Sequence, residues 1–168
     1  MTPPDWALTA AFWIHMLATV VWVGALAVLT MLVIPIGRKS LSRQDFSKLL
    51  EDLLRRLDPI AWLCLVLLIA TGLVQMTGNP NYEGFLAVNN TWAIAILAKH
   101  LVFAAMIPVS AAMTWWALPA LRRQALINAR RDPDQSAAES SRREVALVRI
   151  NFGLSVIVLA LTALARTA

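Results

Sequence analysis

The chain has 168 residues, of which 59% are hydrophobic, and its mean hydropathy is +0.65. Soluble domains contain about 45–50% apolar residues, and the excess here falls in blocks of about 18 residues or more, long enough to cross a bilayer. The composition therefore excludes a soluble protein and predicts an integral membrane protein. The net charge of +5 does not indicate a nucleic-acid partner, because the basic residues gather in two loops between apolar segments.

The first predicted membrane helix runs from about Pro4 to Ile36, and its stretch from Ala11 to Pro35 contains no charged residue. It is longer than the apolar region of a signal peptide, and no basic segment precedes it, so we expect it to remain in the mature protein. This helix carries His15, one of only two histidines in the chain. Polar and ionisable side chains inside a membrane are costly and often functional, so His15 is the first candidate site residue.

A second kind of element is predicted over residues 43–57, where charged residues alternate with apolar ones. Ser42 followed by Asp45 resembles a helix-capping box. The apolar residues then recur at helical spacing on one face; they are Phe46, Leu49, Leu50, Leu53, Leu54 and Leu57. The pattern predicts an amphipathic cytoplasmic helix between the first two membrane helices. That helix would either lie on the membrane surface or pack against the loops of the bundle.

Three further membrane helices are predicted at about residues 59–76, 91–121 and 145–164. The expected fold class is therefore all-α, a four-helix transmembrane bundle that forms a single domain over residues 1–168. In the third helix, Lys99 either has a function or extends its ammonium group to the interface. Near the start of the fourth helix, Asn151 is interpreted as a hydrogen-bonding residue between helices.

The basic residues predict the orientation of the bundle. Six lie between the first and second helices, six lie between the third and fourth, and none lies in the N-terminal segment or in the connection between the second and third helices. Loops rich in Lys and Arg face the cytoplasm, so we expect both termini outside and contact of the basic loops with anionic lipid. The predicted partner is thus the lipid bilayer, and no nucleic acid is expected.

His15 and His100 are predicted to lie at the same depth. The first and third helices run in the same direction, and the two histidines precede Pro35 and Pro119 by 20 and 19 residues. At about 1.5 Å per residue, both imidazoles lie roughly 30 Å from the cytoplasmic end, in the outer half of the membrane. Equal depth on two helices of one bundle predicts a shared ligand.

The chemistry of imidazole leaves the identity of this ligand open between copper and haem b. For copper, Met16 and Met106 are further soft ligand candidates. For haem b, His15 and His100 would be the two axial ligands. The alternative is that each histidine only hydrogen-bonds a neighbouring helix and that the methionines fill gaps in the core.

Three features resemble the copper resistance D (CopD) family: His15 followed after six residues by Trp22-Val23-Gly24, Lys99 within ILAKHLVF, and the ending RINFGLSVIVLALTALAR. The resemblance covers essentially the whole chain. It implies copper uptake or copper tolerance across a bacterial inner membrane, a copper ion as the ligand, and a periplasmic copper donor or acceptor as a partner. It adds Lys99 and Trp22 to the candidate cofactor-binding residues, with packing as the alternative role of Trp22. Four helices are few for a transport path, so a homodimer is compatible with this function.

The histidine of the first helix and the lysine of the third also resemble HemJ, a four-helix membrane protoporphyrinogen oxidase that binds haem. That resemblance implies His15 as a haem ligand and Lys99 as a functional residue. HemJ continues its first helix with an arginine and aromatic residues, whereas this chain reads GALAVLTMLVIP. We therefore predict copper handling rather than an enzyme. Haem b binding, for bis-histidine electron transfer or HemJ-like oxidation, is the first alternative, and a cofactor-free structural subunit is the second.

Overall fold

The structure, a computed structural model, describes residues 3–82, 84, 86, 88–117, 119 and 133–167. Every regular element within these residues is a helix. Four helical segments are long and apolar enough to cross a membrane: Asp5–Ser40, Arg43–Thr77, Thr91–Trp116 and Arg142–Thr167. The prediction of an all-α protein with four long apolar helices is confirmed.

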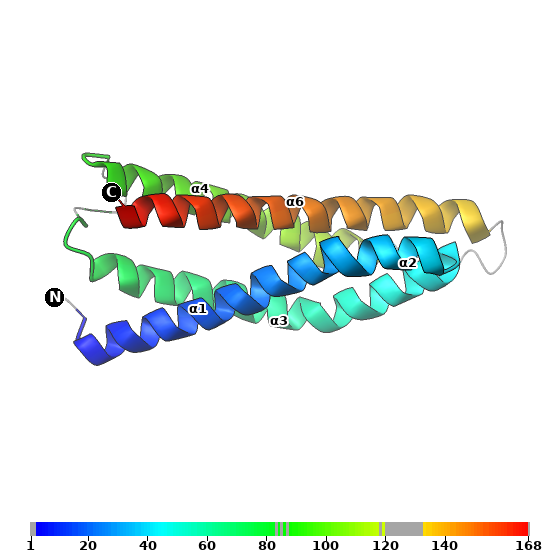
Figure 1. Cartoon of the computed structure of the whole chain (residues 1–168), viewed down its shortest axis with the longest axis horizontal. Coiled ribbons are helices and arrows are strands. Elements are labelled where there is room, and N and C mark those ends of the chain that lie inside the picture. Colours follow the sequence, from blue (N-terminus) through cyan, green and yellow to red (C-terminus); the bar gives the residue numbers. More distant parts are fainter. Residues whose placement is uncertain are drawn as a thin grey trace.

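The four segments form an up-and-down bundle (Figure 1). In chain order the elements are α1 (Asp5–Val28), the π-helical turn η1 (Leu29–Val33), α2 (Ile34–Ser40), α3 (Arg43–Thr77), α4 (Thr91–Ala112), the π-helical turn η2 (Met113–Ala117) and α6 (Pro133–Thr167). Both termini lie at one end of the bundle, together with the connection between α3 and α4. We call this the terminal end, and the opposite end, where α2 meets α3, the basic end. The first span stays helical past Pro35 to Ser40, farther than predicted.

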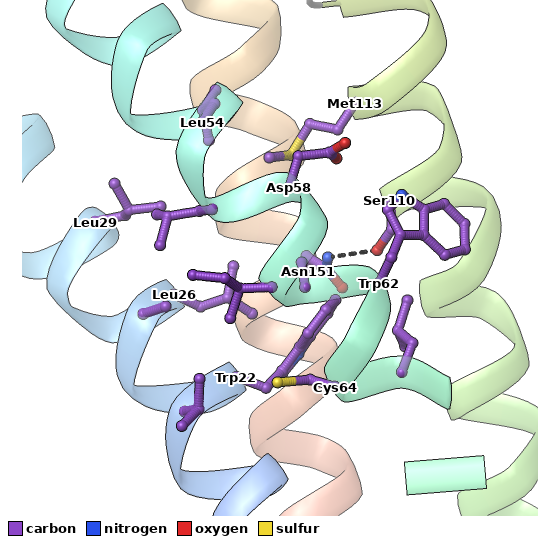
Figure 2. Close-up of a pocket in the computed structure, with 16 residues that line it drawn as sticks. Trp22, Leu26, Leu29, Leu54, Asp58, Trp62, Cys64, Ser110, Met113 and Asn151 are labelled. Atoms are coloured by element: carbon purple, nitrogen blue, oxygen red, sulfur yellow. Dashed lines mark hydrogen bonds between the residues drawn. The ribbon is translucent and has the colours of Figure 1, made fainter. Parts of the chain in front are cut away.

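The helices pack as two pairs. α1 packs mainly against α3, and α4 packs mainly against α6. α6 also contacts α3 and α1, and so joins the two pairs. A small cavity lies in the middle of the bundle and is lined by residues of α1, α3, α4 and α6 (Figure 2).

Residues 43–57 do not form a separate amphipathic helix, so that prediction is wrong. They are the first half of α3, which continues through Pro59 to Thr77. A proline inside a helix removes one backbone donor, but packing against neighbouring helices compensates for this loss. The predicted start is confirmed, because the Asp45 backbone N–H donates to Ser42 Oγ over 3.1 Å.

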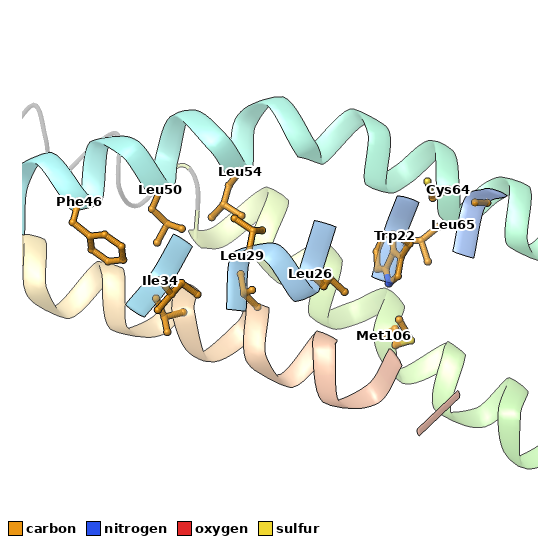
Figure 3. Packing of buried hydrophobic residues seen from close by; sticks show 13 residues of the cluster. Trp22, Leu26, Leu29, Ile34, Phe46, Leu50, Leu54, Cys64, Leu65 and Met106 are labelled. Carbon is orange, nitrogen blue, oxygen red and sulfur yellow. The ribbon is translucent and has the colours of Figure 1, made fainter. Parts of the chain in front are cut away.

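The apolar face of this half of α3 is buried inside the bundle rather than on a membrane surface. Phe46, Leu50 and Leu54 are at most 4% exposed and point toward α1 and α2 (Figure 3). α2 and α3 approach closely here, because a Cβ on Gly37 would lie 2.7 Å from a ring carbon of Phe46. The sequence of this segment resembled a surface helix because its outer face carries charges, whereas its leucine face belongs to the main core.

Candidate functional site

His15 lies half-buried on α1, against α3. Its Nδ1 atom is 2.8 Å from Thr71 Oγ1. The Thr71 hydroxyl donates its own hydrogen to the Leu67 carbonyl, so Thr71 Oγ1 accepts from His15. Nδ1 of a neutral His15 therefore carries the ring hydrogen, and the lone pair is on Nε2. This is the tautomer that a metal ligand bonding through Nε2 needs.

Two more residues of α3 shape the surroundings of His15. A Cβ on Gly72 would lie 3.6 Å from Cε1 of the imidazole, so the missing side chain leaves that edge of the ring uncovered. One turn further along, the Gln75 side-chain amide donates to the Ala11 carbonyl over 3.2 Å. Ala11 precedes His15 by one helical turn, and this bond therefore fixes α1 against α3 beside the imidazole.

His100 lies half-buried on α4. Its Nδ1 atom is 2.7 Å from the Ile96 carbonyl oxygen, one turn earlier on the same helix. A carbonyl can only accept, so Nδ1 carries the hydrogen, and the lone pair of a neutral His100 is again on Nε2. The two histidines therefore share a tautomer, although their described hydrogen bonds run to different helices.

Lys99 is the residue of α4 that acts electrostatically on His15. It is half-buried inside a membrane-spanning helix, and no salt bridge engages it within the described part of the chain. The structure thus brings His15 together with Thr71 by a hydrogen bond and with Lys99 by charge. The described hydrogen bonds include none between His15 and His100, and α1 and α4 are not a main packing pair.

The remaining predicted site residues lie in different surroundings. Met16 is 65% exposed on the outer surface of the bundle, whereas Met106 is 2% exposed in the main core. Trp22 lies in the same core and donates through Nε1 to Ser155 Oγ over 3.2 Å. Across the described residues, no group of three or more His, Cys, Asp or Glu side chains is arranged to hold a metal ion.

A polar network across the middle of the bundle was not predicted from the sequence. The Thr114 hydroxyl contacts both Asp58 Oδ1 and the Ser110 carbonyl, at 2.5 and 3.1 Å. Trp62 Nε1 donates to Thr114 Oγ1 over 3.1 Å, so α3 is tied to the end of the α4 span. Asp58 precedes Pro59, and in the sequence the pair resembled a helix boundary. The sequence signal for this network was the carboxylate of Asp58, which lies between two apolar segments of one continuous helix, α3.

The network continues through α6. The Asn151 side-chain amide donates to Ser110 Oγ over 3.0 Å, which confirms the interhelical role predicted for Asn151. Ser155 lies one turn further along α6 and accepts the indole hydrogen of Trp22. The spacing of Asn151 and Ser155, four residues apart, is the sequence signal for a polar stripe on one face of α6.

A cavity of about 60 Å³ opens beside this network (Figure 2). Asp58, Asn151 and Ser110 supply its polar lining, and Trp22, Trp62, Cys64 and Met113 are among its apolar and sulfur-containing walls. Asn151 is 3% exposed, and its Oδ1 atom has no hydrogen-bond partner. The cavity therefore offers a buried acceptor that a polar occupant would satisfy.

The fold and these interior polar groups define a multi-pass membrane protein. Residues 51–165 match the family described as Copper resistance protein D (CopD). This range covers more than half of the chain, so the chain belongs to the CopD family, and the predicted resemblance is confirmed. No curated protein and no solved structure matches the chain. The matched range includes Lys99, His100 and Asn151, and it begins after α1, which carries His15.

Proposed function

We propose that this protein handles copper at the bacterial inner membrane, in copper homeostasis or transport, with His15 and His100 as ligands of the ion. Membership of the CopD family supports copper as the cargo. The observation that carries the proposal is the shared tautomer, because both Nδ1 atoms are held by oxygen acceptors. An imidazole anchored in this way directs Nε2 toward a metal. Met16 and Met106 remain candidate thioether ligands, and Trp22 remains a candidate wall of the site.

The first experiment is to measure copper stoichiometry and the absorption spectrum of the purified protein. Copper bound near one ion per chain, with no Soret band, is the expected result. A Soret band with sharp bands on reduction would instead identify haem b. If the purified protein contains neither copper nor haem, the result would favour the second alternative, a structural subunit without a cofactor.

Haem b is the second candidate function because of one observation, the charge of Lys99. This ammonium group acts on His15. It would repel a copper cation but attract a haem propionate. The haem would serve electron transfer between two axial histidines, or a HemJ-like protoporphyrinogen oxidation.

Lys99→Met separates these two candidates, because methionine keeps the length of the side chain and removes the charge. If copper is the ligand, copper affinity should stay the same or rise. If haem is the ligand, the fraction of protein with bound haem should fall. Lys39→Met, at an exposed position on α2, is the matched control and should change neither quantity.

We further propose that both termini face the outside, which puts the two histidines in the periplasmic half of the bundle. The basic residues at the other end support this orientation. Reporter fusions at Asn81 and at Arg130 test it, and a cytoplasmic signal from Asn81 would reverse the orientation.

With both termini outside, a periplasmic copper donor or acceptor would meet the terminal end. A homodimer, detectable by mass in detergent, would extend the path beyond four helices.

A further inference from the structure

Among the residues that the structure describes, four buried polar side-chain atoms have no hydrogen-bond partner: Thr30 Oγ1, Glu144 Oε1, Glu144 Oε2 and Asn151 Oδ1. Three of the four belong to α6, and the fourth lies on η1, which packs against α6. Buried polar atoms without partners are rare in proteins, because each loses its hydrogen bonds to water without replacement. Their concentration along one helix requires an explanation.

Glu144 is the most unusual of these residues. It is 1% exposed, and neither carboxyl oxygen has a donor. Val145 and Val148, its neighbours on α6, belong to the main core together with Leu50 of α3. An ionised carboxylate in such surroundings is costly unless it is paired. The carboxyl group therefore needs a proton or another positive species to reside there.

Within the described part of the chain, no basic side chain donates a hydrogen bond to Glu144. Glu51 of α3 acts on it electrostatically and is itself acidic. η1 and η2 contain no titratable residue. The described basic side chains at this end are all exposed: Arg38 and Lys39 of α2, Arg43, Lys48, Arg55 and Arg56 of α3, and Arg142 and Arg143 of α6. A bound proton is thus the simplest species that neutralises Glu144.

Thr30 is a second unusual group at this end of the bundle. Thr9, Thr19, Thr71 and Thr162 each donate their hydroxyl hydrogen to the carbonyl four residues earlier. Thr30 does not, and it lies within a π-helical turn. Such turns disturb the regular i−4 geometry and are frequent at functional sites. The Thr30 hydroxyl is therefore available to exchange hydrogen bonds with water or with a carboxyl group.

The cavity lies further along the same face of α6. Asn151 follows Glu144 by seven residues, which corresponds to about 10 Å and nearly two full turns. The volume of the cavity, about 60 Å³, exceeds the roughly 15 Å³ that one water molecule needs. Asp58 of α3 also lines the cavity. Between Glu144 and Asn151, α6 carries Val148, which is 0% exposed.

We propose that Glu144 is a proton-binding site reached from the basic end, and that it forms a proton pathway with the cavity beside Asn151 and Asp58, which is large enough for water. A hydronium ion of the bulk water at the basic end gives up a proton, which forms an O–H bond with one carboxylate oxygen of Glu144. When the layer around Val148 opens, this O–H bond breaks, the proton passes to a water molecule in the cavity, and Glu144 becomes a carboxylate again. The protonated water then releases the proton to bulk water on the other side of the membrane. The pathway does not depend on which metal or cofactor the protein binds.

The site itself is tested by infrared spectroscopy on the protein in lipid. The wild type should show the carbonyl stretch of a protonated carboxylic acid at neutral pH, and the band should shift on transfer to D2O. Glu144→Gln should remove this band, whereas Asp52→Asn, at an exposed position of α3, should leave it in place. Absence of the band from the wild type would overturn the proposal without any variant, so a folding defect of Glu144→Gln cannot hide the answer.

The pathway is tested by proton flux into liposomes that contain a pH-sensitive dye and are driven by a potassium gradient with valinomycin. Wild-type protein should carry protons faster than empty liposomes. Glu144→Gln should reduce the flux to the level of empty liposomes, and Asp52→Asn should conduct like the wild type. Asn151→Leu, which replaces the orphan acceptor with an apolar group, should also reduce it. Flux in Glu144→Gln equal to that of the wild type would show that the pathway does not exist.

Discussion

The two ends of the bundle treat their polar groups in opposite ways. At the terminal end, His15 is held by Thr71, and the Gln75 amide finds the Ala11 carbonyl. At the basic end, Leu50 and Val148 are 0% exposed, yet Glu144 among them has no partner for either oxygen. At the terminal end, therefore, the side chains of His15 and Gln75 are held in one orientation by hydrogen bonds. The basic end is a tightly packed core around one group that lacks a partner.

This contrast teaches that packing density and polar satisfaction are separate properties of a helical bundle. Membrane helices associate through close van der Waals packing, which needs no hydrogen bond. A polar group can therefore be enclosed without being satisfied, and then an occupant from outside has to complete it.

The largest expected effect concerns the terminal end. His15→Ala and His100→Ala should each abolish most copper or haem binding, and the double variant should bind little less than either single one. The reason is that two ligands of one ion act as a unit, so their losses are not additive. Stoichiometry per purified chain measures this, with Met31→Leu, at a 63% exposed position of η1, as the control for general damage. Losses that simply add, or an effect of only one histidine, would show that the two do not share a site.

The packing of the basic end should respond strongly to Leu50→Ala. Leu50 is 0% exposed in the main core, so truncation should leave a cavity and cost about 2–5 kcal/mol of unfolding free energy. Leu49→Ala is the matched control, because Leu49 is 38% exposed and its truncation should cost far less. Thermal unfolding in detergent provides the comparison. Equal losses at the two positions would mean that this face of α3 is not the buried one.

Gly37→Ala should have a smaller effect at the same end. The new Cβ would lie 2.7 Å from the Phe46 ring, which is itself buried, so α2 and α3 would have to separate. Overpacking of this kind costs about 1–3 kcal/mol. Gly153→Ala on α6 meets no atom within 4 Å and is the control. A melting temperature of Gly37→Ala no lower than that of Gly153→Ala would contradict the close approach of α2 and α3.

The smallest expected effect returns to the terminal end. Gly72→Ala would place a methyl group 3.6 Å from Cε1 of His15, an ordinary contact that folding tolerates. The methyl group covers the ring edge beside Nε2, so ligand affinity should fall, while stability should stay the same or rise because alanine is the better helix former. Gly24→Ala on α1, which meets open space, should leave affinity as in the wild type. Unchanged affinity in Gly72→Ala would indicate that the ligand approaches His15 from another side.

Local sequence determined the helices and some of their ends. Long apolar runs specify membrane spans because the bilayer requires every backbone group to bond within its own segment. The capping side chain of Ser42 and the interhelical amide of Asn151 were also predictable, since a short polar side chain at a helix start or in an apolar face has few possible roles.

Tertiary structure alone decided which polar atoms meet. A membrane helix is apolar on nearly all faces, so periodicity does not reveal how it is rotated in the bundle. For this reason the continuity of α3 through Pro59, the bond between Thr114 and Asp58, and the enclosure of Glu144 could not be read from the sequence. The depth of a residue follows from counting along one helix, whereas its partner follows from the packing of several helices.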